Sequence, residues 1–179
     1  MKSLRLLLFL MLVSFGTVAF AQSDAQKSFD TLKTLGGTWQ GAVSVDPPMA
    51  DMPTGTSVQV SMRVTSRGNA IVHEMKDPAK ADDPTKYDHP VTMFYLDEGR
   101  LLLTHYCDAG NRPRMTARTS ADGKTVEFDF LDVAGSTKTG HMHHAVFTVI
   151  DANHHTEDWT YMMPGDKPFH AHMDLKLTK

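Results

Sequence analysis

The chain has 179 residues, with 18 Lys and Arg against 21 Asp and Glu, and a formal net charge of −3. That length suits one domain, which can bury about two-thirds of its unfolded surface. The charges are interspersed and form no basic stripe, which argues against nucleic acid or an anionic membrane surface as partner.

The first residues have the pattern of a secretory signal peptide. Lys2 and Arg5 precede an apolar run that ends at Phe20, and Ala19 and Ala21 are spaced as a cleavage site. At about fifteen residues the run is too short for a membrane span. We therefore expect a signal peptide over 1–21, a mature domain over 22–179, and a secreted or periplasmic protein without membrane insertion.

The apolar spacing changes once along the mature chain. Phe29, Leu32 and Leu35 recur at helical spacing and two glycines follow, which predicts a short helix over 24–35. Beyond it, apolar and polar residues alternate in runs typical of β-strands. Ten strands are predicted, at 39–45, 58–64, 71–75, 91–96, 101–107, 114–119, 125–131, 142–150, 156–163 and 169–177.

The connections indicate how these strands are joined. Tight-turn patterns at 66–69, 97–99, 121–123 and 151–153 suit antiparallel hairpins. A long meander with open edges would aggregate, and closure removes the edges. We predict an all-β, ten-stranded, antiparallel up-and-down barrel with one short N-terminal helix. The longer connections 46–55 and 77–90 are either a lid at the rim or simple solvated loops.

The segment Leu-Gly-Gly-Thr-Trp-Gln-Gly at 35–41 resembles the Gly-x-Trp pattern that opens the first strand of lipocalin-like (calycin) barrels. The mature chain as a whole is similar to uncharacterised lipocalin-like domains of secreted bacterial proteins. This resemblance implies that Trp39 closes the barrel floor and that the partner is a small-molecule ligand.

A second resemblance is to nitrobindin-type haem barrels. It is carried by the segment 103–114, which contains His105, and by Pro-Phe-His-Ala-His-Met at 168–173. The resemblance implies haem as cofactor, with His172 as its ligand. However, alternation puts His170 and His172 on the strand face opposite the apolar one, so reaching the interior needs an inward face or a bulge. The pair could also meet a metal, as could His141 and His143, since residues two apart share a face.

A ligand site is predicted around the fifth and sixth strands. His105 and Cys107 follow two leucines on one face, which would add polar groups to an apolar cavity. An inward arginine nearby would favour a ligand carboxylate, whereas an arginine paired with Glu127 or Asp129 would not. The candidate ligand-binding residues are His73, His105, Tyr106, Cys107, Arg112 and Arg114.

Three functions follow from these patterns. The first is a non-enzymatic exported barrel for an apolar or amphipathic ligand, the second a haem or metal protein using His172, and the third an enzyme with a lumenal site around His105. The sequence has no phosphate-binding glycine loop, zinc-protease motif, serine-hydrolase motif or Cys-x-x-Cys. Glu157 and Asp158 are possible acid–base groups that alternation alone does not distinguish from solvated residues. The ligand and the oligomeric state are left open.

Overall fold

A computed structural model describes residues 23–50, 52–119 and 123–178. The predicted signal peptide and the turn residues 121 and 122 lie outside this range. The elements are α1 (Asp24–Lys33), β1 (Gly37–Asp46), β2 (Thr56–Thr65), β3 (Ala70–Lys76), β4 (Val91–Asp97), β5 (Arg100–Tyr106), β6 (Arg112–Thr119), β7 (Thr125–Ala134), β8 (His141–Asp151), β9 (His154–Met163) and β10 (Lys167–Leu177), with a 3₁₀ turn at Ser66–Gly68.

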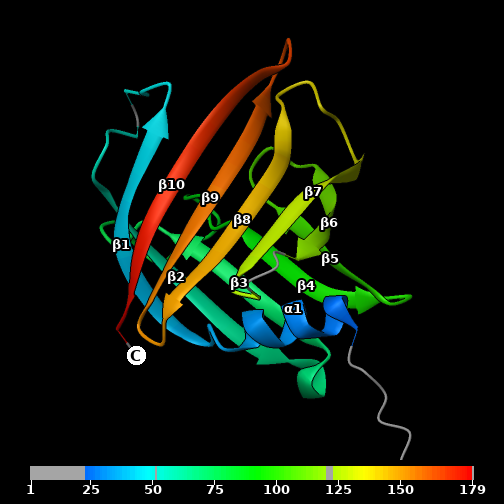
Figure 1. Ribbon diagram of the computed structural model, residues 1–179. Helices are drawn as coiled ribbons and strands as arrows, with labels where there is room; N and C mark the ends of the chain where they lie inside the picture. Colours follow the sequence, from blue (N-terminus) through cyan, green and yellow to red (C-terminus); the bar gives the residue numbers. More distant parts are fainter. Residues whose placement is uncertain (1–22, 51, 120–122, 179) are drawn as a thin grey trace, which may run out of the picture.

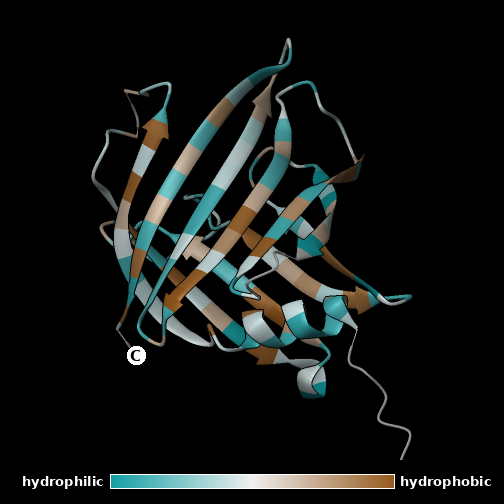
Figure 2. Cartoon of the chain, viewed as in Figure 1, coloured by the Kyte–Doolittle hydropathy of each residue, from teal (hydrophilic) through white to brown (hydrophobic). Residues whose placement is uncertain are grey.

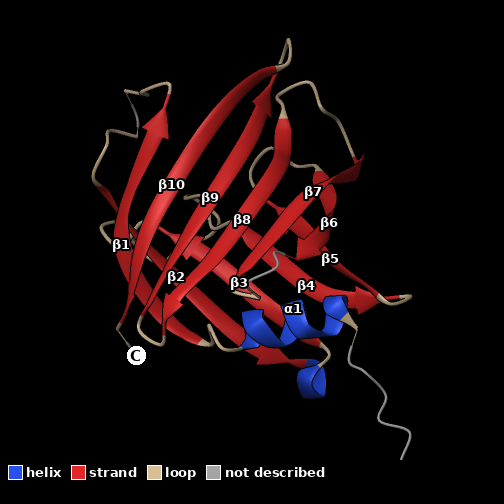
Figure 3. Cartoon of the chain, viewed as in Figure 1, coloured by secondary structure: helices blue, strands red, loops and turns tan. Residues whose placement is uncertain are grey.

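The strands form one closed antiparallel barrel (Figures 1 and 3). Each strand pairs with its neighbours in the sequence, and β1 pairs with β10 to close the sheet. The predicted ten-stranded barrel with a single short α-helix is therefore confirmed. Strand β9 begins two residues before the predicted start at residue 156, so His154 and His155 belong to the strand and pair with β10.

Alternation along the strands separates the core from the surface (Figure 2). On β10, Met173 and Leu175 are buried while the residues between and beside them are exposed. Inside the barrel, aromatic rings from β4, β7 and β8 pack edge to face or tilted, with 5.3 Å between the centroids of Phe94 and Phe147 and 6.0 Å between those of Phe128 and Phe147. Such pairs add to the stabilisation from burial alone.

One end of the barrel is closed by α1, which lies at the bottom of Figure 1. The Ser23 side chain caps the helix by accepting a hydrogen bond from the Gln26 N–H. The helix residues Phe29 and Leu32 are buried. Trp39 is 1% exposed and its indole Nε1 donates to the Leu35 carbonyl at 2.8 Å. The predicted place of Trp39 at the floor is confirmed.

The seam between β1 and β10 explains the second glycine of the Gly-x-Trp-x-Gly pattern. A Cβ atom added to Gly41 would lie 1.8 Å from the Asp174 carbonyl oxygen. Only glycine allows the two backbones to approach this closely.

The long connections 46–55 and 77–90 both lie at the other end, because β1 and β3 run away from α1. The tight turns at 66–69, 97–99 and 151–153 lie at the α1 end. This arrangement leaves the long connections around the mouth of the barrel. In the described part of the chain, no helix is long and apolar enough to cross a membrane.

Candidate functional site

A cavity of about 430 Å³ occupies the mouth half of the barrel. Valine, phenylalanine and alanine side chains of β1, β2 and β10 form part of its walls, and residues of both long connections line its rim. The volume lies in the range of small-molecule sites, roughly 300–1,000 Å³. Six methionines line it, which are Met49, Met52, Met75, Met142, Met163 and Met173.

His105 lies at the floor of this cavity. Its side chain is 1% exposed, and its Nδ1 is 2.8 Å from the hydroxyl oxygen of Thr92 on β4. Its Nε2 is also buried and has no hydrogen-bond partner among the described residues. Burial, and secondarily the electrostatic effect of His73, lowers the pKa of His105 to about 3. The ring is therefore neutral at physiological pH.

A buried polar network lies beneath the floor. Its centre is Glu157 on β9, whose carboxylate is 0% exposed. His73 Nε2 lies 3.1 and 3.0 Å from its two oxygens, His155 Nε2 lies 3.0 Å from Oε1, and Trp159 Nε1 donates to Oε2 at 3.0 Å. Because the indole can only donate, this oxygen must accept, and three side chains together satisfy the carboxylate.

These partners keep Glu157 ionised. Burial raises the pKa of its carboxyl, but the charge and hydrogen bond of His73 and the hydrogen bond of His155 outweigh burial, so the net pKa is lowered. Trp159 then connects the network to the site, since its ring also lines the cavity and its centroid lies 5.4 Å from that of His105. The network holds the floor residues in position from below.

The depressed pKa of His105 predicts a pH dependence of stability. An unfolded histidine has a pKa of about 6.5, so between about pH 6.5 and 3 the unfolded chain binds a proton that the folded protein does not. This contribution is fully present above about pH 6.5 and is lost as pH falls. Wild type should therefore lose about 1.4 kcal/mol per pH unit more than His105→Leu between about pH 6 and 4.5, measured by chemical denaturation.

His172→Leu is the matched control, because His172 is on the surface, where its partner is Asp158. It should keep most of the wild-type slope, since such surface pairs contribute about 0–1 kcal/mol. Equal slopes in wild type and His105→Leu would contradict the assignment of a neutral buried ring.

Of the other candidate ligand residues, some lie inside the barrel and some lie on its outer face. Cys107 lines the cavity and is partly buried, and burial raises the pKa of its thiol. His73 is fully buried in the Glu157 network and does not line the cavity. Tyr106 is 45% exposed on the outer face of β5.

Neither arginine reaches the cavity, so the expectation of an inward guanidinium is corrected. Arg112 is exposed, and Arg114 Nε donates to Asp132 Oδ1 at 2.8 Å on the outer face. The Asp132 carboxylate raises the pKa of Arg114. The ion pair with Glu127 and Asp129 is made by Arg118 instead.

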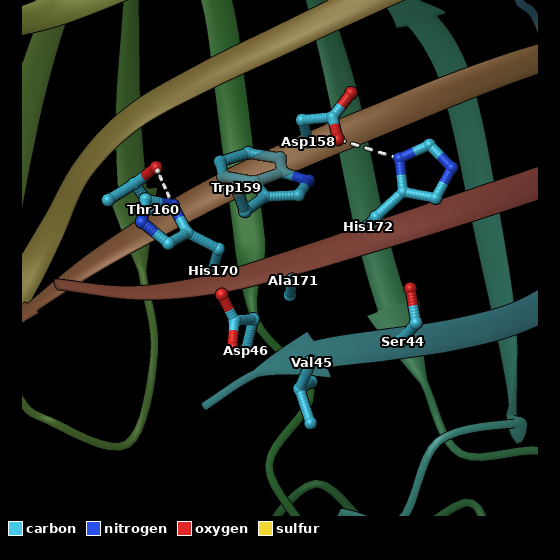
Figure 4. A pocket seen from close by; sticks show the side chains of 9 residues that line it. All are labelled: Ser44, Val45, Asp46, Asp158, Trp159, Thr160, His170, Ala171 and His172. Carbon is cyan, nitrogen blue, oxygen red and sulfur yellow. Dashed lines mark hydrogen bonds and ion pairs between the residues drawn. The ribbon is translucent and has the colours of Figure 1, made fainter. Parts of the chain in front are cut away.

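His170 and His172 lie on the outer face of β10 (Figure 4). His172 Nδ1 is 2.6 Å from Asp158 Oδ1, and His170 Nδ1 is 3.0 Å from the Thr160 hydroxyl, both beside a shallow outer cleft of about 170 Å³. Since no bulge re-aims β10 against β9, His172 does not face the barrel interior. The residues present therefore do not fit a haem held in the cavity by His172.

Among the described residues, one other group of side chains could hold a metal ion. Within residues 23–50, 52–119 and 123–178, only Glu127, Asp129 and His144 bring three ligand atoms together. Arg118 already pairs with both of these carboxylates. His141 and His143 contact each other at 3.3 Å and pack on Phe130.

Sequence reasoning missed several residues of the site. Thr92, His155 and Trp159 were not singled out, and Glu157 was not separated from Asp158. Trp159 could have revealed two of these residues, because a buried tryptophan on a strand places the residues two and four positions earlier on the same inward face. His155 and Glu157 stand at those positions.

The fold and site define a closed antiparallel β-barrel with an apolar cavity and one histidine at its floor. No family model matches the sequence, and no curated protein matches it. Among solved structures, the chain is similar to EF1p2_mFAP2b bound to DFHBI, with 11% identity, a TM-score of 0.40, and coverage of 84% of this chain and 99% of the other.

Two further structures are similar at about the same coverage. A redesigned β-barrel has 12% identity and a TM-score of 0.34, over 83% of this chain and 96% of the other. A protein of unknown function from the DUF3598 family of Nostoc punctiforme has 7% identity and a TM-score of 0.26, over 84% of this chain and 99% of the other.

Proposed function

We propose that this barrel binds a small apolar or amphipathic molecule in its cavity without transforming it. The observation that carries the proposal is the cavity of about 430 Å³, whose walls are mainly apolar and whose floor presents His105. Sites of this kind combine an apolar enclosure with a few polar groups that orient the ligand.

The methionines of the lining support the same function. Met is unbranched and polarizable, so it adapts to ligands of different shape. Met75, Met142 and Met173 come from β3, β8 and β10, while Met49 and Met52 come from the connection 46–55 at the mouth. The wall is therefore adaptable both at the entrance and beside the floor.

Filling the cavity tests this function. Ala171 of β10 faces the cavity, so Ala171→Phe should reduce binding of Nile red, a neutral dye that fluoresces in apolar surroundings, by about tenfold or more. Titration of wild type and variant measures the change. Lys176→Phe adds the same ring to the exposed face of the same strand and should leave the affinity unchanged.

Equal loss in both variants would show that the dye binds outside the barrel. Absence of saturable binding to folded wild type would contradict the function itself. Native mass spectrometry of freshly purified protein complements the titration, because a retained ligand reveals its mass.

We also propose that the protein acts outside the cytoplasm. The support is the signal-peptide pattern over 1–21, with Lys2 and Arg5 before the apolar run and small residues at Ala19 and Ala21. N-terminal sequencing of the protein from the producing cells tests this, with Gln22 as the expected first residue. A protein that still begins with Met1 would contradict export with cleavage of the signal peptide.

A further inference from the structure

Hydrogen-bond accounting assigns the proton on His105. The Thr92 hydroxyl has one partner among the described residues, the Nδ1 atom of His105 at 2.8 Å. If the hydroxyl donates to Nδ1, its proton is satisfied and the ring carries its own proton on Nε2. If Nδ1 donates instead, both the hydroxyl proton and the Nε2 lone pair are left without partners.

The first arrangement leaves one unsatisfied group and the second leaves two, so the first is favoured. The buried Nε2 of His105 is then an N–H donor at the floor of an apolar cavity, without an acceptor among the residues that the structure describes. A buried donor without a partner destabilises its site, and a ligand that supplies the acceptor removes this penalty.

The charges around the cavity restrict that acceptor. Three carboxylates, Asp77, Asp88 and Asp108, line the mouth, and burial together with Asp108 raises the pKa of Asp88. Among the described residues of the lining, the one cationic side chain is Lys76, which pairs with Asp82 at 3.2 Å. A ligand carboxylate would pass a negative mouth and reach a neutral histidine, without a free cation in this part of the lining to offset its desolvation.

We propose that the cavity selects a neutral apolar molecule with a carbonyl oxygen at its buried end, and that this oxygen accepts a hydrogen bond from His105 Nε2–H. This inference rests on the proposed binding function and names its ligand class. Nε2 is buried in this structure. Because methionine side chains are flexible, the lining can shift on binding so that the carbonyl reaches this atom.

Binding of three probes of similar length tests the selection by displacement of Nile red. Methyl decanoate offers a neutral carbonyl, dodecane offers none, and decanoate offers a carboxylate. At pH 7, the ratio of the affinity for methyl decanoate to the affinity for dodecane should be about tenfold or more higher in wild type than in His105→Leu. His172→Leu should keep the wild-type ratio, and wild type should bind decanoate about tenfold or more weakly than methyl decanoate.

The tautomer is a second readout that does not depend on binding. Nitrogen-15 chemical shifts of the His105 ring in ligand-free wild type should show the proton on Nε2. Thr92→Val, which removes the hydroxyl donor and keeps the shape, should weaken both this preference and the selectivity for the ester.

The outcomes separate this inference from the function on which it rests. A proton on Nδ1, the same ester-to-alkane affinity ratio in wild type and His105→Leu, or tighter binding of decanoate than of the ester would each overturn the inference and leave a general apolar site. If none of the probes displaces the dye and no dye binds, the binding function itself fails.

Discussion

Replacing Glu157 by alanine should lower the free energy of unfolding by about 3–5 kcal/mol, the range for removing one member of a buried charged pair. The variant leaves the facing nitrogens of His73, His155 and Trp159 buried without the oxygens that they now contact. Each unsatisfied buried group costs about 1–3 kcal/mol, less whatever water enters the new space. Urea denaturation at pH 7 measures the change.

Asp158→Ala is the adjacent control. Asp158 lies on the outer face of the same strand and pairs with His172, with both side chains 49% exposed. Its loss should change the free energy of unfolding by about 0–1 kcal/mol. If the two variants are equally stable, Glu157 does not hold the core together and the network is not satisfied as described.

The Glu157 contribution should also weaken in acid. Its folded-state pKa is lowered, so the stability that it supplies is present above the unfolded pKa of about 4.3 and is lost as pH falls through the lower folded value. The loss from His105 begins at higher pH, because its unfolded pKa is higher. The two groups therefore act in successive parts of the acid range.

The barrel could be predicted because alternation is a local property. Apolar residues at every second position, interrupted by short turn patterns, identify each strand from its own residues. Trp39 could be placed from its neighbours for the same reason. The inward position of His105 and Cys107 followed from their alternation with Leu101 and Leu103.

The buried network around Glu157 could not be predicted in this way. His73 and Glu157 are 84 residues apart, and their contact forms only because the closed barrel brings β3 and β9 to face each other across the core. His154 and His155 are both polar and follow a turn, so the alternation predicts a strand that starts two residues too late. Without His155 in the strand, the inward position of Glu157 could not be distinguished from a solvated one.

Arg114 illustrates a different limit. Its neighbour Met115 is buried, so alternation alone already favours an outward guanidinium. The nearby His105 and Cys107 suggested a ligand role, and an ion pair with Glu127 or Asp129 was the alternative that the sequence left open. The structure instead pairs Arg114 with Asp132, next to a bulge in the β6–β7 register. No pattern in the residues around Arg114 predicts that partner.

Trp39→Ala should destabilise the protein by about 3–5 kcal/mol, the range for truncating a fully buried large aromatic side chain. Trp39 is 1% exposed, and its ring packs edge to face on His155, with 4.3 Å between the centroids. Its indole also donates to the Leu35 carbonyl at 2.8 Å. The substitution therefore opens a space between the helix end of the barrel and the Glu157 network.

The same substitution should affect the floor of the cavity less than it affects stability. His155 lies between Trp39 and Glu157, so the loosened end of the barrel is separated from His105 by the whole network. Denaturation gives the stability, and Nile red titration of the folded variant gives the affinity, which should change by about threefold or less. Gln40→Ala, one residue along on the exposed face, is the control and should change neither quantity. A stability loss under about 1 kcal/mol in Trp39→Ala would show that this end of the barrel collapses around the missing ring.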